Sequence, residues 1–210
     1  MNDASRQRAD QFRPLVAFDF DGTLTWRDSF RAFLAWKSGG GRYSLGLAQL
    51  APDALGWLHH RDRGRLKAAM VRRFMGGARL EDVEADARAF ATDQARALLR
   101  PDAMRLWRQW QARNARLIIV TASPEIVVAP FAHGLGADML IGTRLVVDTK
   151  DRLTGDLSGP NCRGPEKVAR LRDVFGADVR LEAAYGDSAG DLEMLALAEE
   201  AGMKVFGARP

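Results

Sequence analysis

The chain has 210 residues, of which 47% are hydrophobic and 28% are charged, and its net charge is +4. This composition excludes a fibrous or disordered chain and suffices for one core with a smaller inserted subdomain. The single cysteine, Cys162, excludes an internal disulfide and favours a reducing compartment. The polar N-terminus lacks the apolar segment of a secretory signal, and no apolar run is long enough to span a membrane, so we expect a cytoplasmic protein.

The positive charge is concentrated in the middle of the chain. Residues 30–100 hold 13 Lys or Arg against 7 Asp or Glu, so the rest of the chain is slightly acidic. A basic segment of this kind attracts phosphate, an anionic membrane or nucleic acid, and a solvated arginine-rich helical surface has the same composition. Because aromatic residues are not interleaved with the basic ones, we expect no specific nucleic-acid binding. The sequence leaves the oligomeric state open.

The predicted elements begin with a flexible arm over residues 1–13 and a short strand over 15–20. From residue 28 to 100, only helical patterns and turn signals follow. The predicted helices of this block cover residues 28–38, 42–51, 63–75 and 79–99, with breaks at Gly39–Gly41, Pro52 and Gly76–Gly77. We therefore predict an all-helical cap domain over residues 30–100, inserted directly after the first strand.

Strands and helices alternate again after Pro101. The predicted order is helix 102–114, strand 115–123, helix 124–136, a strand with a hairpin over 137–159, helix 165–176, strand 179–188, helix 189–202 and a last strand over 203–207. Buried strands that alternate with helices indicate a parallel sheet covered on both faces. We predict an α/β core that consists of residues 14–29 and 101–210.

Polar residues cluster directly after three of the predicted strands. In open α/β sheets, ligands bind at the carboxyl ends of the strands, so we expect these clusters to converge in space. The clusters are Asp19 with Asp21, Thr121-Ala122-Ser123, and Asp187-Ser188 with Asp191.

The paired carboxylates indicate a cation. Asp19 and Asp21 leave an extended segment on the same side, so their like charges repel each other unless a cation compensates them. Mg²⁺ fits this role because it prefers oxygen ligands and retains waters that substrate phosphate can replace. Asp187 would add a third carboxylate and Lys167 a fixed positive charge, while Gly22 lets the chain turn tightly after the acids.

These motifs together resemble those of the haloacid dehalogenase superfamily. The segments "DFDGT", "IIVTAS", "GPEKVARL" and "YGDSAGDLEML" are similar to its four motifs and occur in the same order. The helical insertion resembles a C1 cap, which is typical of the phosphoserine-phosphatase-like branch and of subfamily IB hydrolases. The resemblance implies a Rossmann-like parallel sheet with helices on both faces and a Mg²⁺-dependent phosphatase.

The resemblance also implies roles for the motif residues. Asp19 would attack phosphorus and form an aspartyl-phosphate, and Asp21 would act first as general acid and then as general base. Asp21 favours phosphoryl transfer over dehalogenation, because a halide leaving group needs no proton. Mg²⁺ would be held by Asp19, by the backbone carbonyl of Asp21 and by Asp187.

The remaining motif residues would bind the phosphoryl group or support the site. The resemblance implies that the Thr121 hydroxyl, the Ala122 amide and the Lys167 ammonium hold the phosphoryl oxygens. Asp191 would orient Lys167 or a metal-bound water, and Ser188 would support the same loop.

The substrate is left open between several phosphate esters. Asp28 stands where phosphoserine phosphatases carry an acidic residue that binds substrate, but the fourth motif differs from their Gly-Asp-Gly-x-Asn-Asp. The apolar stretch over residues 43–65 resembles the cap of lipid phosphatases such as phosphatidylglycerophosphatase C, and would form either the core of the cap or an interfacial helix on an anionic inner membrane face. The hypotheses are a phosphatase for a small phosphorylated metabolite, including phosphoserine, a lipid-phosphate phosphatase, and a catalytically silent regulatory or binding protein.

Overall fold

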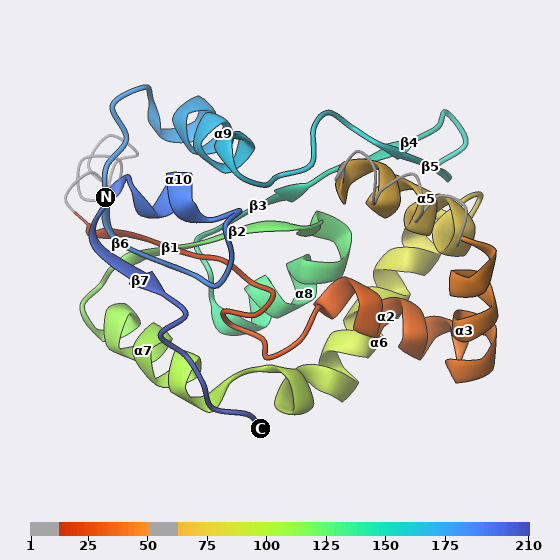
Figure 1. The fold of residues 1–210 in the computed structure, drawn as a ribbon, viewed down its shortest axis with the longest axis horizontal. Coiled ribbons are helices and arrows are strands. Elements are labelled where there is room, and N and C mark those ends of the chain that lie inside the picture. Colours follow the sequence, from red (N-terminus) through yellow and green to blue (C-terminus); the bar gives the residue numbers. More distant parts are fainter. Residues whose placement is uncertain (1–12, 51–62) are drawn as a thin grey trace, which may run out of the picture.

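The computed structural model describes residues 13–50 and 63–210, which Figure 1 shows as a ribbon. The predicted arm over residues 1–13 lies outside the described residues except for Arg13. The Arg13 guanidinium donates hydrogen bonds to the carbonyls of Asn114 and Ala115 at 3.0 and 2.9 Å. These bonds hold the chain against the start of the second strand.

A five-stranded parallel sheet forms the centre of the molecule. Its strands are β1 (Leu15–Phe18), β2 (Arg116–Pro124), β3 (Met139–Thr143), β6 (Leu181–Gly186) and β7 (Ala198–Met203). Their order is β3-β2-β1-β6-β7, and every neighbouring pair is parallel. Because β1 lies between β2 and β6, the residues that follow these three strands meet at one edge of the sheet.

Helices cover both faces of this sheet, as the sequence predicts. Successive residues of β1 point to opposite faces, so Val16 and Phe18 pack in one buried cluster and Ala17 in another. The first cluster includes side chains of α7 (Pro101–Ala112) and α8 (Glu125–Leu135). The second includes side chains of α9 (Pro165–Phe175) and α10 (Leu192–Leu195), which lie above the sheet in Figure 1.

The named elements that the structure describes between β1 and α7 are all helices, and they lie at one end of the molecule (Figure 1). These helices are α2 (Ser29–Ser38), α3 (Gly40–Gln49), α5 (Arg63–Met75) and α6 (Leu80–Leu98). The predicted glycine break is shorter than expected, because Gly40 begins α3 and only Gly39, at φ +73°, forms the corner. The division into a core and a cap at residues 30 and 100 stays a prediction. Phe33 and Phe90 of the inserted helices belong to the same buried cluster as side chains of β1, so the hydrophobic packing is continuous across this division.

An antiparallel hairpin joins the core to the inserted helices. It consists of β4 (Leu145–Val147) and β5 (Leu153–Leu157), which lie beside α5 in Figure 1. Leu153 exchanges backbone hydrogen bonds with the turn after α5, receiving one from Gly77 at 2.8 Å and donating one to Ala78 at 3.0 Å. The amide of Leu80 donates to Asp151 at 2.8 Å. The hairpin therefore fixes the turn between α5 and α6.

The prediction for the C-terminal segment is wrong. A helix over residues 189–202 was expected from its alanines and glutamates, but α10 has only four residues and Ala198–Met203 form the edge strand β7. Parallel pairing with β6 satisfies the backbone of this segment, and the Tyr185 hydroxyl donates to Glu200 Oε1 at 2.6 Å. This tertiary pairing overrides the local helix propensity.

Candidate active site

Asp19 lies at the carboxyl end of the central strand. Its amide donates to the carbonyl of Tyr185 at 2.9 Å, which continues the pairing of β1 with β6. The residue is buried, and Thr23 Oγ1 donates to its Oδ2 at 3.3 Å. The sheet and the following turn thus hold this carboxylate in one position.

Lys167 brings a fully buried positive charge to Asp19. The residue lies in the first turn of α9 and is 1% exposed. Its Nζ donates to Asp19 Oδ1 at 2.6 Å, to Asp191 Oδ1 at 2.7 Å and to the carbonyl of Val120 at 2.6 Å, which uses all three ammonium hydrogens. Burial disfavours the charge, but the two carboxylates outweigh it and raise the pKa of Lys167.

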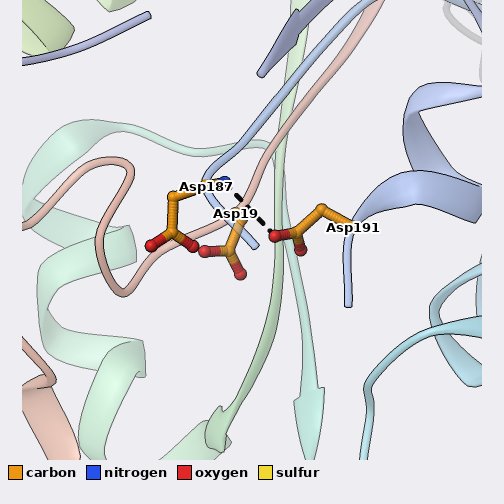
Figure 2. A group of neighbouring side chains, drawn as sticks. All are labelled: Asp19, Asp187 and Asp191. Atoms are coloured by element: carbon orange, nitrogen blue, oxygen red, sulfur yellow. Dashed lines mark hydrogen bonds between the residues drawn. The ribbon is translucent and has the colours of Figure 1, made fainter. Parts of the chain in front are cut away.

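Asp191 organises the loop that follows β6. Its Oδ2 accepts hydrogen bonds from the amide and the hydroxyl of Ser188 at 2.9 and 3.0 Å, and from the amide of Asp187 at 3.3 Å. Figure 2 shows this contact between Asp187 and Asp191. Burial alone would raise the pKa of Asp191, but Lys167 and these donors hold it below the ordinary value. Asp191 thus contacts both Lys167 and Ser188, and the supporting roles of Asp191 and Ser188 stay predictions.

Three carboxylates from two loops, one after β1 and one after β6, meet beside Lys167. Carboxylate oxygens of Asp19, Asp187 and Asp191 lie within 4.8 Å of one another, and Figure 2 shows them side by side. Burial raises the pKa of Asp19 to about 7, against the attraction of Lys167. Burial and repulsion by Asp191 and Asp21 raise the pKa of Asp187. One ammonium does not balance this group, so a divalent cation fits it.

Gly22 is required by this arrangement. Its φ is +86°, which other residues rarely adopt. A Cβ at this position would lie 2.0 Å from Oδ2 of Asp187. The glycine thus allows the turn after β1 to approach the loop after β6, which brings Asp187 close to Asp19.

The Asp21 carboxylate lies outside the group formed by Asp19, Asp187 and Asp191. Its Oδ1 accepts from the amide of Ser29 at 2.6 Å, and its Oδ2 accepts a short hydrogen bond from the Ser123 hydroxyl. Burial and then repulsion by Asp28 raise the pKa of Asp21, against these hydrogen bonds. A carboxyl group with a raised pKa is suited to donate a proton.

The predicted phosphate-binding residues line a cavity above these carboxylates. The cavity has a volume of about 530 Å³ and is bordered by Thr121, Ala122 and Lys167, as well as by Asp19 and Asp21. Thr121 is buried, and its Oγ1 accepts from the amide of Ser123 at 3.0 Å. The fold therefore brings the candidate nucleophile, acid and phosphate-binding groups to one hollow.

Asp28, the candidate substrate-binding acid, also borders the cavity. Its Oδ1 accepts from the amide of Arg31 at 2.8 Å and caps the N-terminus of α2. One of its oxygens therefore has a structural partner.

Several residues around the cavity received no role from the sequence. Ser29 and Ser123 bind Asp21, and Lys67 reaches the carbonyl of Ala122 from helix α5. Asn161 and Arg163 also line the cavity, as do Arg27 and Arg31. Ser123 stands in the second motif and could have been found there, but Lys67 belongs to a basic amphipathic helix that gives no signal of its own.

Residues 16–196 match the family of haloacid dehalogenase-like hydrolases. Protein CicA of Caulobacter vibrioides is 58% identical over 196 residues, which cover 93% of this chain and 88% of CicA. A phosphoserine phosphatase of Halobacterium salinarum is 31% identical over 186 residues, which cover 86% of this chain and 81% of that protein.

Solved structures show the same fold. A protein of unknown function from Bordetella pertussis superposes with a TM-score of 0.73 at 24% identity, covering 90% of this chain and 88% of that one. A substrate-bound phosphoserine phosphatase superposes with a TM-score of 0.57 at 21% identity, covering 91% and 85%. The chain therefore belongs to the haloacid dehalogenase-like hydrolase family, and within it to the phosphoserine-phosphatase-like phosphatases.

Proposed function

We propose that this chain is a Mg²⁺-dependent phosphomonoester hydrolase that acts through an aspartyl-phosphate on Asp19. The observation that carries the proposal is the pairing of the buried Asp19 with Lys167 at the end of the central strand, at 2.6 Å. A buried carboxylate in a fixed position beside a cation, at the floor of a cavity, is suited to attack phosphorus. We also propose that residues 30–100 act as a cap over a core of residues 14–29 and 101–210.

Asp19 and Asp21 divide the reaction between them. An oxygen of Asp19 forms a bond to phosphorus while the bond to the leaving oxygen breaks, and Asp21 gives its proton to that oxygen. Asp21 then accepts a proton from the water that hydrolyses the acyl phosphate, which regenerates Asp19. Hydrogen bonds from Ser29 and Ser123 keep Asp21 oriented through both steps.

The donor set fits Mg²⁺. Asp19 and Asp187 offer carboxylate oxygens from two strand ends, and we propose that the backbone carbonyl of Asp21 completes the protein ligands. When bound, Mg²⁺ would neutralise charge on the phosphoryl oxygens. Thr121 and the Ala122 amide would bind those oxygens, while Lys167 would hold Asp19 and Asp191 in place.

Hydrolysis of p-nitrophenyl phosphate tests the proposal. Wild type should require Mg²⁺, and Asp19→Asn should show no turnover. Asp21→Asn should release one equivalent of nitrophenol in a burst and then stall, because nitrophenolate leaves without a proton but the second step needs the base. A catalytically silent regulatory protein would show no turnover on any phosphoester, and a full steady-state rate in Asp19→Asn would contradict the nucleophile.

The substrate is either a small phosphorylated metabolite, for which phosphoserine is one candidate, or a lipid phosphate. One observation favours the lipid candidate. Leu45 on α3 is 59% exposed and lines a shallow surface hollow with basic residues. These residues are Lys37, Arg42 and Arg73. An apolar side chain among cations is suited to an anionic bilayer.

The membrane candidate needs its own test. Part of the apolar stretch over residues 43–65, including Leu55, Trp57 and Leu58, lies outside the described residues. Among the described helices, none combines the length and hydrophobicity that crossing a bilayer requires. Flotation with vesicles that contain an anionic phospholipid should carry wild type but not Leu45→Glu. Flotation of neither protein would exclude this candidate in favour of a small substrate.

A further inference from the structure

Arg163 has no role in the proposed reaction, although its side chain borders the cavity that holds Asp19. It stands directly before α9, and its Nη1 donates to Ser188 Oγ at 3.3 Å. Within residues 13–50 and 63–210, no carboxylate forms a salt bridge with this guanidinium. Its side chain therefore contacts a hydroxyl of the loop after β6, the loop that also carries Asp187 and Asp191.

A glycine of that loop makes room for the guanidinium. A Cβ on Gly190 would lie 2.5 Å from both Cζ and Nη1 of Arg163, so the guanidinium packs directly on the backbone of the loop. The amide of Gly164 donates to the carbonyl of Gly190 at 2.9 Å and holds the two segments together. Arg163 is therefore built into the loop and does not extend freely into solvent.

The Ser188 hydroxyl uses its full capacity for hydrogen bonds, which is one hydrogen and two lone pairs. Its oxygen accepts from Arg163 Nη1 at 3.3 Å and from the Gly190 amide at 3.2 Å. It donates to Asp191 Oδ2 at 3.0 Å. Since donors occupy both lone pairs, the hydroxyl hydrogen is directed at Asp191.

The Asp191 carboxylate is saturated in turn. Its Oδ1 accepts from Lys167, while its Oδ2 accepts from the Ser188 hydroxyl and from the amides of Ser188 and Asp187. These bonds fill the roughly four lone-pair sites of a carboxylate, so none is left for a cation. Asp19, by contrast, accepts hydrogen bonds from Lys167 and Thr23 alone among the described residues, so it keeps lone pairs for a metal ion.

We infer that Arg163 is a positioning residue for the candidate active site. By donating to Ser188, its guanidinium directs that hydroxyl at Asp191, and the saturated Asp191 carboxylate stays on Lys167 instead of turning to the metal. Lys167 is then held by two carboxylates, so it keeps the candidate nucleophile Asp19 in place. This inference rests on the proposed phosphatase function and adds to it a residue that precedes the third motif.

A double-mutant cycle with p-nitrophenyl phosphate tests whether Arg163 acts through Ser188. Arg163→Ala frees a lone pair on Ser188 and lets the hydroxyl rotate away from Asp191. We expect kcat to fall about tenfold, the size of one charge-assisted hydrogen bond, while KM stays nearly the same. In the Ser188→Ala background, the same substitution should change kcat by less than about twofold, because the hydroxyl through which it acts is already gone. Arg163→Lys keeps a charged donor and should lose less than Arg163→Ala.

Gly190→Ala displaces the guanidinium without removing it. The backbone at Gly190 has no positive φ, so the added Cβ acts through its clash with Arg163. The variant should lose kcat as Arg163→Ala does, and it should change little in the Arg163→Ala background, where the clashing atoms are gone. Arg108→Ala removes an exposed arginine of α7, and Gly134→Ala adds a Cβ that meets no atom within 4 Å. Both controls should keep the wild-type kcat.

Urea unfolding without Mg²⁺ measures the same coupling without turnover. The stability lost in the double variant Arg163→Ala/Ser188→Ala should be smaller than the sum of the losses in the single variants. Thermal unfolding of each variant checks that it is folded at the assay temperature.

Three results would overturn the inference while the phosphatase stands. These are an unchanged kcat in Arg163→Ala, an equal loss of kcat in both Ser188 backgrounds, and losses of stability that add up fully. If wild type hydrolyses no phosphoester, the proposed function fails. The unfolding cycle then still decides whether Arg163 and Ser188 are coupled.

Discussion

Gly22→Ala should damage the metal site far more than it damages the fold. The backbone at Gly22 has φ +86°, so any side chain there adds strain of about 1–2 kcal/mol. The added Cβ would also lie 2.0 Å from Oδ2 of Asp187, a distance that real Cβ atoms do not show. The carboxylate is the end of a side chain and can rotate away at small cost to stability. That rotation removes a proposed Mg²⁺ ligand, so we expect Mg²⁺ affinity to fall by about 10- to 100-fold.

Gly159→Ala is the matched control for this experiment. Gly159 has nearly the same backbone conformation, at φ +85°, but a Cβ there would meet no atom within 4 Å. Both variants should lose similar thermal stability, whereas only Gly22→Ala should shift the half-saturating Mg²⁺ concentration for p-nitrophenyl phosphate hydrolysis. If both variants kept the wild-type Mg²⁺ dependence, Asp187 would not be a ligand and the proposed metal site would be wrong.

Two further outcomes concern charge. Lys167→Met leaves Asp19 and Asp191 buried without their cation, so urea unfolding without Mg²⁺ should show a loss of about 3–5 kcal/mol, and unchanged stability would contradict the pairing. Mg²⁺ at 100 times its Kd should stabilise wild type by about 2.7 kcal/mol in a thermal-shift assay, and Asp19→Asn should lose most of this gain.

Sequence periodicity predicted most elements but failed at the C-terminus. Strand β2 has a run of β-branched and apolar residues that is typical of a buried strand. Helix α6 has the apolar spacing of an amphipathic helix. The segment Ala198–Met203 has neither pattern, and its alanines and glutamates favour a helix. It forms an edge strand because β6 offers it backbone partners, and such partners come from a distant part of the chain.

The candidate site, too, was predicted only in part from the sequence. The sequence indicated that Asp19, Asp187 and Lys167 would converge, because each follows or faces a strand end of a parallel sheet. It did not indicate that the Asp21 carboxylate would lie outside the group of Asp19, Asp187 and Asp191 and accept a hydrogen bond from Ser123. The spacing of Asp19 and Asp21 in an extended strand predicts that they share a side, but β1 ends at Phe18 and the chain already turns at Phe20, before Asp21.

By itself, the sequence determined the family, the parallel α/β core with its helical insertion and the set of residues available for phosphoryl transfer. These properties follow from local patterns, because the order of consecutive residues indicates strand ends, helix faces and motif spacing. Only the tertiary structure decided which carboxylates lie together, which hydroxyl donates to Asp21 and which inserted helix brings Lys67 to the cavity. Such contacts join residues far apart in the chain, so they depend on how the inserted helices pack against the edge of the sheet.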